Sequence, residues 1–171
     1  MIRGLFARLT GEPRRGQALF ALAVTEARRP HWYLEGEVPD TVEGRFAMLS
    51  TLVALLIVRL ERAGAEGETA SVALTERFVE AMDTEIREMG VGDPSLGKQV
   101  RKLVGALGGR VEKWRATVEG GDEWTPVVVR SVYRNAPASN GALAHSEAAL
   151  KALWQRIAAA PVEQLRDGSL E

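Results

Sequence analysis

The sequence predicts an all-α protein, a single-domain helical bundle of about five to seven helices. Apolar residues recur every three or four positions along most of the chain, which is the spacing of one helix face. The main apolar stretch, Phe46 to Val58, has 13 residues, of which only Ser50 and Thr51 are polar. Because a bilayer-spanning helix needs about 20 apolar residues, this run is typical of a central buried helix. Only residues 126–135 are rich enough in β-branched side chains to allow a strand, and a helix is favoured there too.

The composition is that of an ordinary globular protein, with 171 residues of which 46% are hydrophobic. The absence of cysteine excludes disulfides, thiolate metal sites and cysteine nucleophiles, and it suits an intracellular, cytoplasmic protein. The two histidines, His31 and His145, are far apart in sequence, and we expect no metal and no cofactor. A net charge of −1 argues against a broad basic field and therefore against specific DNA binding.

Two parts are expected along the chain: a short basic amphipathic segment, residues 1–13, and a single helical domain, residues 14–171. The segment has the pattern of a helix lying on an anionic membrane surface. The alternative is a frayed or core-docked turn, which is favoured because Gly4, Gly11 and Pro13 limit helix formation. The apolar residues of the segment are Ile2, Leu5, Phe6 and Leu9.

The sequence of the first half of the domain predicts two helices separated by a loop. The first covers Arg14 to Arg29 and ends before Pro30, whose ring disfavours helix in the preceding residue. The loop, PHWYLEGEVPD, leads to a helix that begins at Asp40 or Thr41, with Glu43 near the acidic position of a capping box. This second helix is the central one, and a turn over residues 64–68 ends it.

The second half continues with a helix over residues 69–89, followed by Gly90 at a position that favours a left-handed conformation. Asp93 then has the place of an N-cap, and a long helix runs from there to the Gly120-Gly121 pair. Residues 136–142 are expected to form a loop and residues 143–159 a helix before a short tail. The long helix is expected to point these apolar residues inward: Leu96, Val100, Leu103, Val104, Leu107, Val111 and Trp114.

The corner between these helices resembles a phosphate-binding loop, since Gly92 begins the run GDPSLGKQ. Two features argue against nucleotide binding. Gln99 stands where a serine or threonine would hold Mg²⁺, and a helix rather than a strand precedes the glycines. The exposed helix start could still hold an anion, so a small-molecule or anion-binding helical protein, using the Gly90–Lys98 corner, is the alternative function.

Other chemistry has little support in the sequence. Glu80, Asp83 and Glu85 lie on one helix face but lack the Glu-x-x-His motif of a di-iron bundle, and neither histidine is paired with a nucleophile. The aromatic run at residues 31–33 could stack a base or a quinone ring. The favoured interpretation is that these aromatics plug the helical core. We therefore expect no enzyme.

Two stretches carry a resemblance to a known family. The first is ARRPHWYLEGEVPDTVEGRFAML, residues 27–49, and the second is VEAMDTEIREMGVGDPSLGKQVRKL, residues 79–103. Together they are similar to the ubiquinol–cytochrome c chaperone family, and the VYRN run at residues 132–135 adds a shorter match. The resemblance covers about residues 14–135. Arg101 is the visible departure, because lysine is expected there and the charge is kept.

The resemblance implies an all-helical assembly chaperone and not an enzyme. Such a protein would bind newly made cytochrome b, or another subunit of the cytochrome bc1 complex, during biogenesis of the respiratory chain. A small partner protein or the ribosome would take part. The short chain resembles a bacterial member, acting in the cytoplasm with peripheral contact at the inner face of the membrane.

Within this interpretation, two groups of residues are candidates for contact with a client or partner. Four glycines, Gly44, Gly90, Gly92 and Gly97, are expected to serve close packing or left-handed turns. The basic face on the long helix could meet anionic lipid, ribosomal RNA or an acidic client. The candidate residues are Trp32, Tyr33, Pro39, Asp40, Arg45 and Phe46 in the first group, and Asp93, Lys98, Arg101 and Lys102 in the second.

Overall fold

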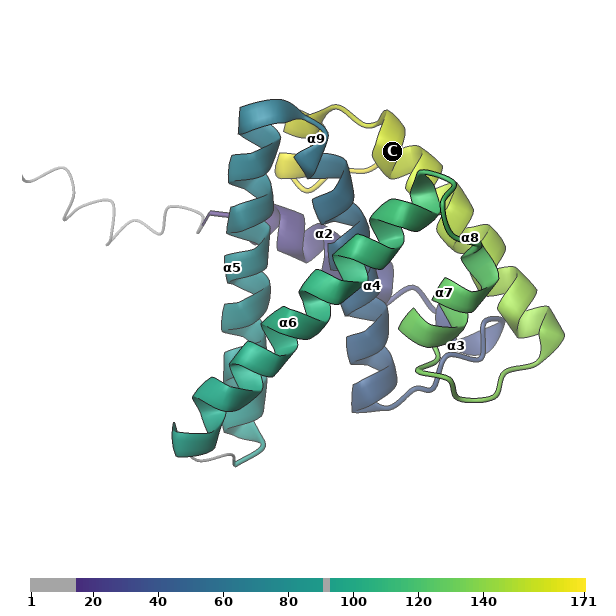
Figure 1. Cartoon of the computed structure of the whole chain (residues 1–171), viewed down its shortest axis with the longest axis horizontal. Coiled ribbons are helices and arrows are strands. Elements are labelled where there is room, and N and C mark those ends of the chain that lie inside the picture. The colour runs from purple at the N-terminus through teal and green to yellow at the C-terminus, as the bar shows by residue number, and fades with distance from the viewer. Residues whose placement is uncertain (1–14, 91–92) are drawn as a thin grey trace, which may run out of the picture.

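The computed structural model describes residues 15–90 and 93–171, so the predicted segment 1–13 and Gly92 lie outside the described residues. Within that part of the chain all regular structure is helical, which confirms the all-α prediction (Figure 1). The helices are α2 (Gln17–Ala27), α3 (His31–Leu34), α4 (Val42–Glu61), α5 (Gly64–Glu88), α6 (Asp93–Val118), α7 (Trp124–Ser131), α8 (Asn140–Ala159) and α9 (Val162–Arg166).

Helix α4 lies at the centre of the bundle. Helices α2, α5, α6, α7 and α8 all contact it, and α6 crosses it at a slant (Figure 1). Every residue from Ala47 to Leu60 is buried or partly buried. This explains why the run from Phe46 to Val58 is apolar on every side rather than amphipathic. The predicted central buried helix is therefore confirmed.

The beginning of α4 is determined by a cap and a close backbone approach. The Thr41 hydroxyl accepts a hydrogen bond from the Gly44 amide at 3.1 Å, which makes Thr41 the N-cap. Glu43 then lies in the first turn, one position before that of a capping-box acid. A Cβ at Gly44 would lie 1.9 Å from the carbonyl oxygen of Pro39. Only glycine lets the preceding loop pass this close to the helix.

The turn predicted at residues 64–68 is instead helical. Helix α5 begins at Gly64, whose φ of +68° is available to glycine at little cost, so the turn needs only Arg62 and Ala63. At its other end α5 reaches Glu88, and Gly90 has a φ of +82°, as predicted. A helix, and not a strand, thus enters the glycine corner, and α6 begins at Asp93.

The burial of α6 increases along its length. Leu107, Val111 and Trp114 are buried as predicted, but Val104 is 43% exposed, which corrects the prediction that it points inward. Val100 and Leu103 are only partly buried, because the slanted crossing carries the first half of α6 past the edge of the core (Figure 1). The side chain of Leu96 is outside the described residues.

The C-terminal elements differ from the prediction mainly at their ends. Residues 124–131 form helix α7, so the helical interpretation of residues 126–135 holds for most of that stretch. Helix α8 begins at Asn140 rather than at residue 143, because the Ser139 hydroxyl accepts from the Ala142 amide at 3.1 Å. The predicted loop after Pro30 contains one helical turn, α3, and the tail contains α9.

The glycines of α4 and α6 give a matched test of this packing. We expect Gly44→Ala to lower the free energy of unfolding by about 1–3 kcal/mol, because the new methyl group overlaps the Pro39 carbonyl. Gly108→Ala should raise it by about 0.5–1 kcal/mol, because a Cβ there meets no described neighbour within 4 Å and alanine favours helix. Urea unfolding of both variants measures the two shifts. Equal effects would contradict the close approach at Gly44.

Candidate functional site

Backbone strain gathers where two loops meet. Among the described residues, three non-glycine residues have a positive φ: Glu37 at 50°, Arg134 at 53° and Asn135 at 63°. We call residues 30–41 and 132–139 together the loop junction. Residues held in the left-handed region cost free energy and are often found at functional sites. Both loops also carry motif residues of the family resemblance, which makes the junction the first candidate site.

Tyr133 joins the two loops from inside. Its side chain is 2% exposed, and its hydroxyl donates to the carbonyl oxygen of Gly36 at 2.6 Å and lies 2.8 Å from the Ser146 hydroxyl. Burial raises the pKa of the Tyr133 hydroxyl, so it stays protonated and able to donate. A Cβ at Gly36 would lie 2.5 Å from the Trp32 carbonyl oxygen, so glycine is required where the tyrosine docks.

Glu37 joins the same loops from outside. Its carboxylate accepts hydrogen bonds from the amide and the hydroxyl of Ser139, each at 3.0 Å. These two donors lower the pKa of Glu37, because they favour the ionised form. Ser139 is also the N-cap of α8. The strained conformation at Glu37 is thus held by contacts that connect the first loop to the start of α8.

The two aromatic candidates in the first loop have different environments. Trp32 is 1% exposed, and its indole N–H donates to the Glu26 carbonyl oxygen at 2.9 Å. It packs in the core and offers no surface to a client, which fits the core-plug interpretation. Tyr33 is half-buried, and its hydroxyl donates to the Ala27 carbonyl at 2.7 Å. The Arg45 guanidinium lies 5.8 Å from the centre of the Tyr33 ring.

The rest of the first group lies at the surface beside Tyr33. Arg45 Nε donates to Asp40 Oδ1 at 2.5 Å, and this contact lowers the pKa of Asp40. Both side chains are more than half exposed, so the pair adds little to stability. Pro39 is partly buried, and the partly buried ring of Phe46 lies 6.0 Å from that of Phe78.

Two exposed apolar residues at this place were missed in the sequence. Leu34, at the end of α3, is 73% exposed, and Val42, the first residue of α4, is 66% exposed. We call Leu34, Pro39, Asp40, Val42 and Arg45 the junction surface. Both missed residues lie inside the quoted motif, at helix ends where an apolar side chain has no core to face. Their position at a predicted helix end was the sequence signal by which these two exposed residues could have been found.

The second candidate group lies on α6 and is separate from the first. Lys98, Arg101 and Lys102 are exposed, as predicted, while the side chain of Asp93 is outside the described residues. No hydrogen bond or ion pair between described residues connects this group to the junction surface. Gly97 has room for a methyl group, with Arg101 Nη1 at 3.7 Å as its nearest neighbour, so close packing does not explain that glycine.

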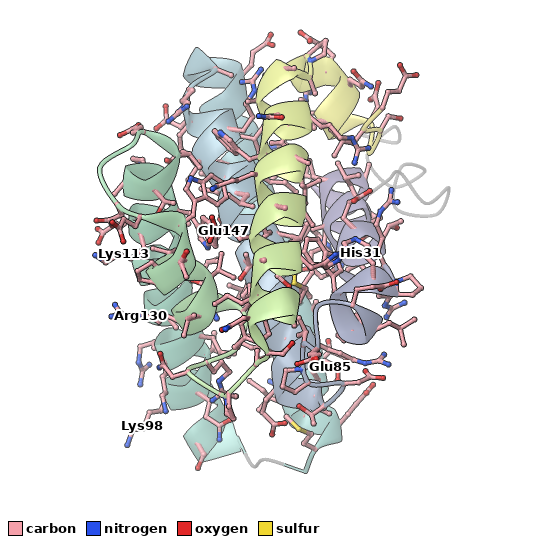
Figure 2. All side chains as sticks on the ribbon, turned by 90° about the vertical axis from the view of Figure 1, so that its right-hand side faces the viewer. His31, Glu85, Lys98, Lys113, Arg130 and Glu147 are labelled. Atoms are coloured by element: carbon pink, nitrogen blue, oxygen red, sulfur yellow. The ribbon has the colours of Figure 1, made fainter. Side chains whose placement is uncertain are left out.

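The histidines form a pair that the sequence did not reveal. His31 Nδ1 lies 3.0 Å from His145 Nε2, which connects α3 to α8 across 114 positions of sequence (Figure 2 labels His31). Burial lowers the pKa of His31, and the charge of His145 lowers it further. In residues 15–90 and 93–171, no three histidine, aspartate or glutamate side chains come close enough to hold a metal ion.

A buried carboxylate, also missed, fastens α2. Glu26 is 5% exposed, accepts a hydrogen bond from Arg29 at 2.7 Å and lies 4.0 Å from Nη1 of Arg156 on α8. The contact with Arg156 connects α2 to α8, and the Glu26 backbone carbonyl, which accepts from the Trp32 indole, connects α2 to α3.

Comparison with known proteins agrees with the motif resemblance. A family model described as "Ubiquinol-cytochrome C chaperone" matches residues 35–171. The chain belongs to this family. A crystal structure of the Cbp3 homolog from Brucella abortus shares the fold, with a TM-score of 0.80 at 24% identity, covering 100% of this chain and 97% of that one. No curated protein matches the chain by sequence. None of the described helices has the length and apolarity needed to cross a membrane.

Removing the Tyr133 hydroxyl tests how the junction is held. We expect Tyr133→Phe to lower the free energy of unfolding by about 1–3 kcal/mol, because the buried Gly36 carbonyl loses its donor. Tyr33→Phe is the matched control. Its hydrogen bond to the Ala27 carbonyl is only part-buried, so the loss should be about 0.5–1.5 kcal/mol. A larger loss for Tyr33→Phe would contradict this account of the junction.

The histidine pair predicts a pH dependence of stability. Because the pKa of folded His31 lies below its ordinary value of 6.5, the unfolded chain binds more protons near that pH. The contribution of the histidine pair to the free energy of unfolding is therefore complete above pH 6.5 and is lost as the pH falls below it. The carboxyl groups whose pKa values are lowered change the stability only below about pH 4.5. Urea unfolding between about pH 5 and pH 7.5 should show this slope in the wild type, and His31→Gln should flatten it. An unchanged slope would disprove the role of the pair.

Proposed function

We propose that this protein is a non-enzymatic assembly chaperone that binds newly made cytochrome b, or another subunit of the ubiquinol–cytochrome c reductase complex, during biogenesis. Membership of the chaperone family over residues 35–171 is the observation that carries the proposal. It would act in the cytoplasm, at the inner face of the membrane where such a client is inserted.

The junction surface is the proposed contact with the client. Leu34 and Val42 expose apolar side chains that a globular core would ordinarily bury. Leu34 follows Tyr33, whose ring Arg45 faces, and Val42 lies two residues after Asp40, the partner of Arg45. An apolar segment of the client could cover Leu34 and Val42, while polar groups of the client could contact the Asp40–Arg45 pair. Capture of an unfolded or partly inserted client requires apolar contact of this kind.

The loop junction supports this role by being rigid. The contacts of Tyr133 and Glu37 hold the backbone on both sides of the surface, so little conformational freedom remains to be lost when a client binds. A surface prepared in this way binds more tightly than a loop that must first be ordered. The strain at residues 37, 134 and 135 is then a cost that the fold accepts for a defined shape.

The proposal is tested in a strain that lacks the gene, complemented with variants of the protein. Leu34→Ser and Val42→Ser together should weaken co-purification of cytochrome b by about tenfold or more, since burying one such side chain contributes about 1.5–3 kcal/mol. The spectroscopic level of the bc1 complex should fall with it. Val72→Ser is the matched control, because Val72 is 53% exposed on α5, away from the junction.

The outcomes of this experiment test the chaperone role and the client-binding surface separately. Normal bc1 levels in the strain without the gene would disprove the chaperone role. A defect in that strain that both the double variant and the control fully repair would leave the role standing and disprove the junction surface as the client contact.

A further inference from the structure

A row of basic side chains runs along the outer side of α6 and continues onto α7. Lys98 and Lys113 lie at the two ends of the row on α6, 15 residues or about 22 Å apart at the rise of a helix. Figure 2 shows Lys98, Arg130 and Lys113 along one edge of the molecule. We call this row the basic strip. Its members are Lys98, Arg101, Lys102, Lys113, Arg130 and Arg134.

The arginines from α7 and the turn after it adjoin the α6 residues. Lys113 and Arg130 line the same open hollow, of about 340 Å³, between α6 and α7. Arg110 crosses between the two elements, where its guanidinium donates to the Ser131 carbonyl oxygen at 2.7 Å. Arg134 is close enough that its charge, after the effect of burial, lowers the pKa of Arg110. Arg110 thus joins the α6 and α7 parts of the strip, and the acidic residues at this end are Glu112, Asp122 and Glu123.

Most of the charge on this strip is not neutralised. Lys98, Arg101, Lys102, Arg130 and Arg134 make no ion pair or hydrogen bond with any residue that the structure describes. Lys113 is the exception, with Asp122 at 3.5 Å. Elsewhere most exposed cations have carboxylate partners, among them Arg29, Arg45, Arg62, Arg115 and Lys151. Like charges held together without counter-charges favour a negatively charged partner.

Between the two ends of the strip, the exposed side of α6 carries glycines, which have no side chains. A Cβ added at Gly105, Gly108 or Gly109 would meet no described neighbour within 4 Å, so the fold itself does not require glycine there. Glycine inside a helix is unfavourable compared with alanine. Without side chains at these positions, the backbone of α6 can come close to a flat surface while lysine and arginine reach forward on both sides.

We propose that the basic strip binds the anionic surface of a phospholipid membrane. A lipid surface needs only several cations in one plane, and the strip supplies them along one edge of the molecule (Figure 2). None of the large hydrophobic residues that are exposed in the described part of the chain is aromatic, so the strip offers no exposed ring on which RNA bases could stack. The inference goes beyond client binding, because five of the six strip residues lie outside the loop junction, which the strip reaches only at Arg134.

Docking through the strip would also orient the molecule. His31, near the junction, lies across the molecule from Lys98 and Arg130 in Figure 2. Glu85 on α5 is also apart from the labelled basic residues in that view, although α5 and α6 contact each other. A membrane would attract the strip, and the junction surface would stay accessible beside the bilayer.

The test measures binding of the full chain to lipid vesicles by flotation, without any client. Vesicles of phosphatidylcholine alone are compared with vesicles of phosphatidylcholine mixed with phosphatidylglycerol. The wild type should bind only the anionic vesicles, and raising NaCl from about 0.1 M to about 0.5 M should release it. Lys98→Gln, Arg101→Gln and Lys102→Gln combined should weaken binding about a hundredfold, at about fivefold for each basic residue.

A control variant removes the same charge elsewhere. Arg15→Gln, Arg28→Gln and Arg166→Gln combined change three exposed arginines near α2 and α9, and this protein should bind like the wild type. Equal binding to both vesicle types, or unchanged binding of the strip variant, would overturn the proposal. It would also be overturned if RNA displaced the protein from vesicles and the strip bound RNA more tightly. None of these results bears on cytochrome b, so the chaperone proposal is tested separately.

Discussion

The burial of α4 on all sides is the constraint on which the rest of the structure depends. Five other helices contact it, so the position of each one is set by the same apolar surface. Its first turn has a second role. Because the Pro39 carbonyl passes so close to Gly44, the loop that leaves α3 can reach the helix along one path only. The core therefore determines where Leu34, Asp40 and Val42 stand at the surface.

The loop junction holds the backbone on both sides of the junction surface in one conformation. Tyr133 and Glu37 each connect segments about a hundred residues apart, one through a buried hydroxyl and the other through an exposed carboxylate. Neither bond lies in a helix, yet together they hold backbone that would otherwise relax. A chaperone has to bind a client and release it. A rigid platform with a few exposed apolar residues suits that cycle, because little is gained or lost in reorganising the platform. The basic strip meets the loop junction only at Arg134, and its members on α6 and α7 could bind a membrane at the same time.

Local rules predicted much of the fold and only part of the site. The caps at Thr41 and Gly90, the apolar run of α4 and the start of α6 follow from neighbouring residues, and the structure confirms them. The contact of His31 with His145 and that of Tyr133 with Gly36 join distant segments, which no periodic pattern reveals. Val104 shows the limit of periodicity, since it lies at the edge of an apolar stripe that extends past the core. For Trp32, composition could not decide between surface and core, and the bond to the Glu26 carbonyl decided it.

The central claim is that a client meets this protein at the loop junction. The most direct measurement replaces Leu34 with a photoreactive amino acid, irradiates cells that are making cytochrome b and identifies the cross-linked product. Val72, an apolar residue that is also exposed, on α5, carries the same probe in a parallel strain. The account predicts a cytochrome b adduct from position 34 and none from position 72. Adducts of equal yield from both positions, or from position 72 alone, would contradict it.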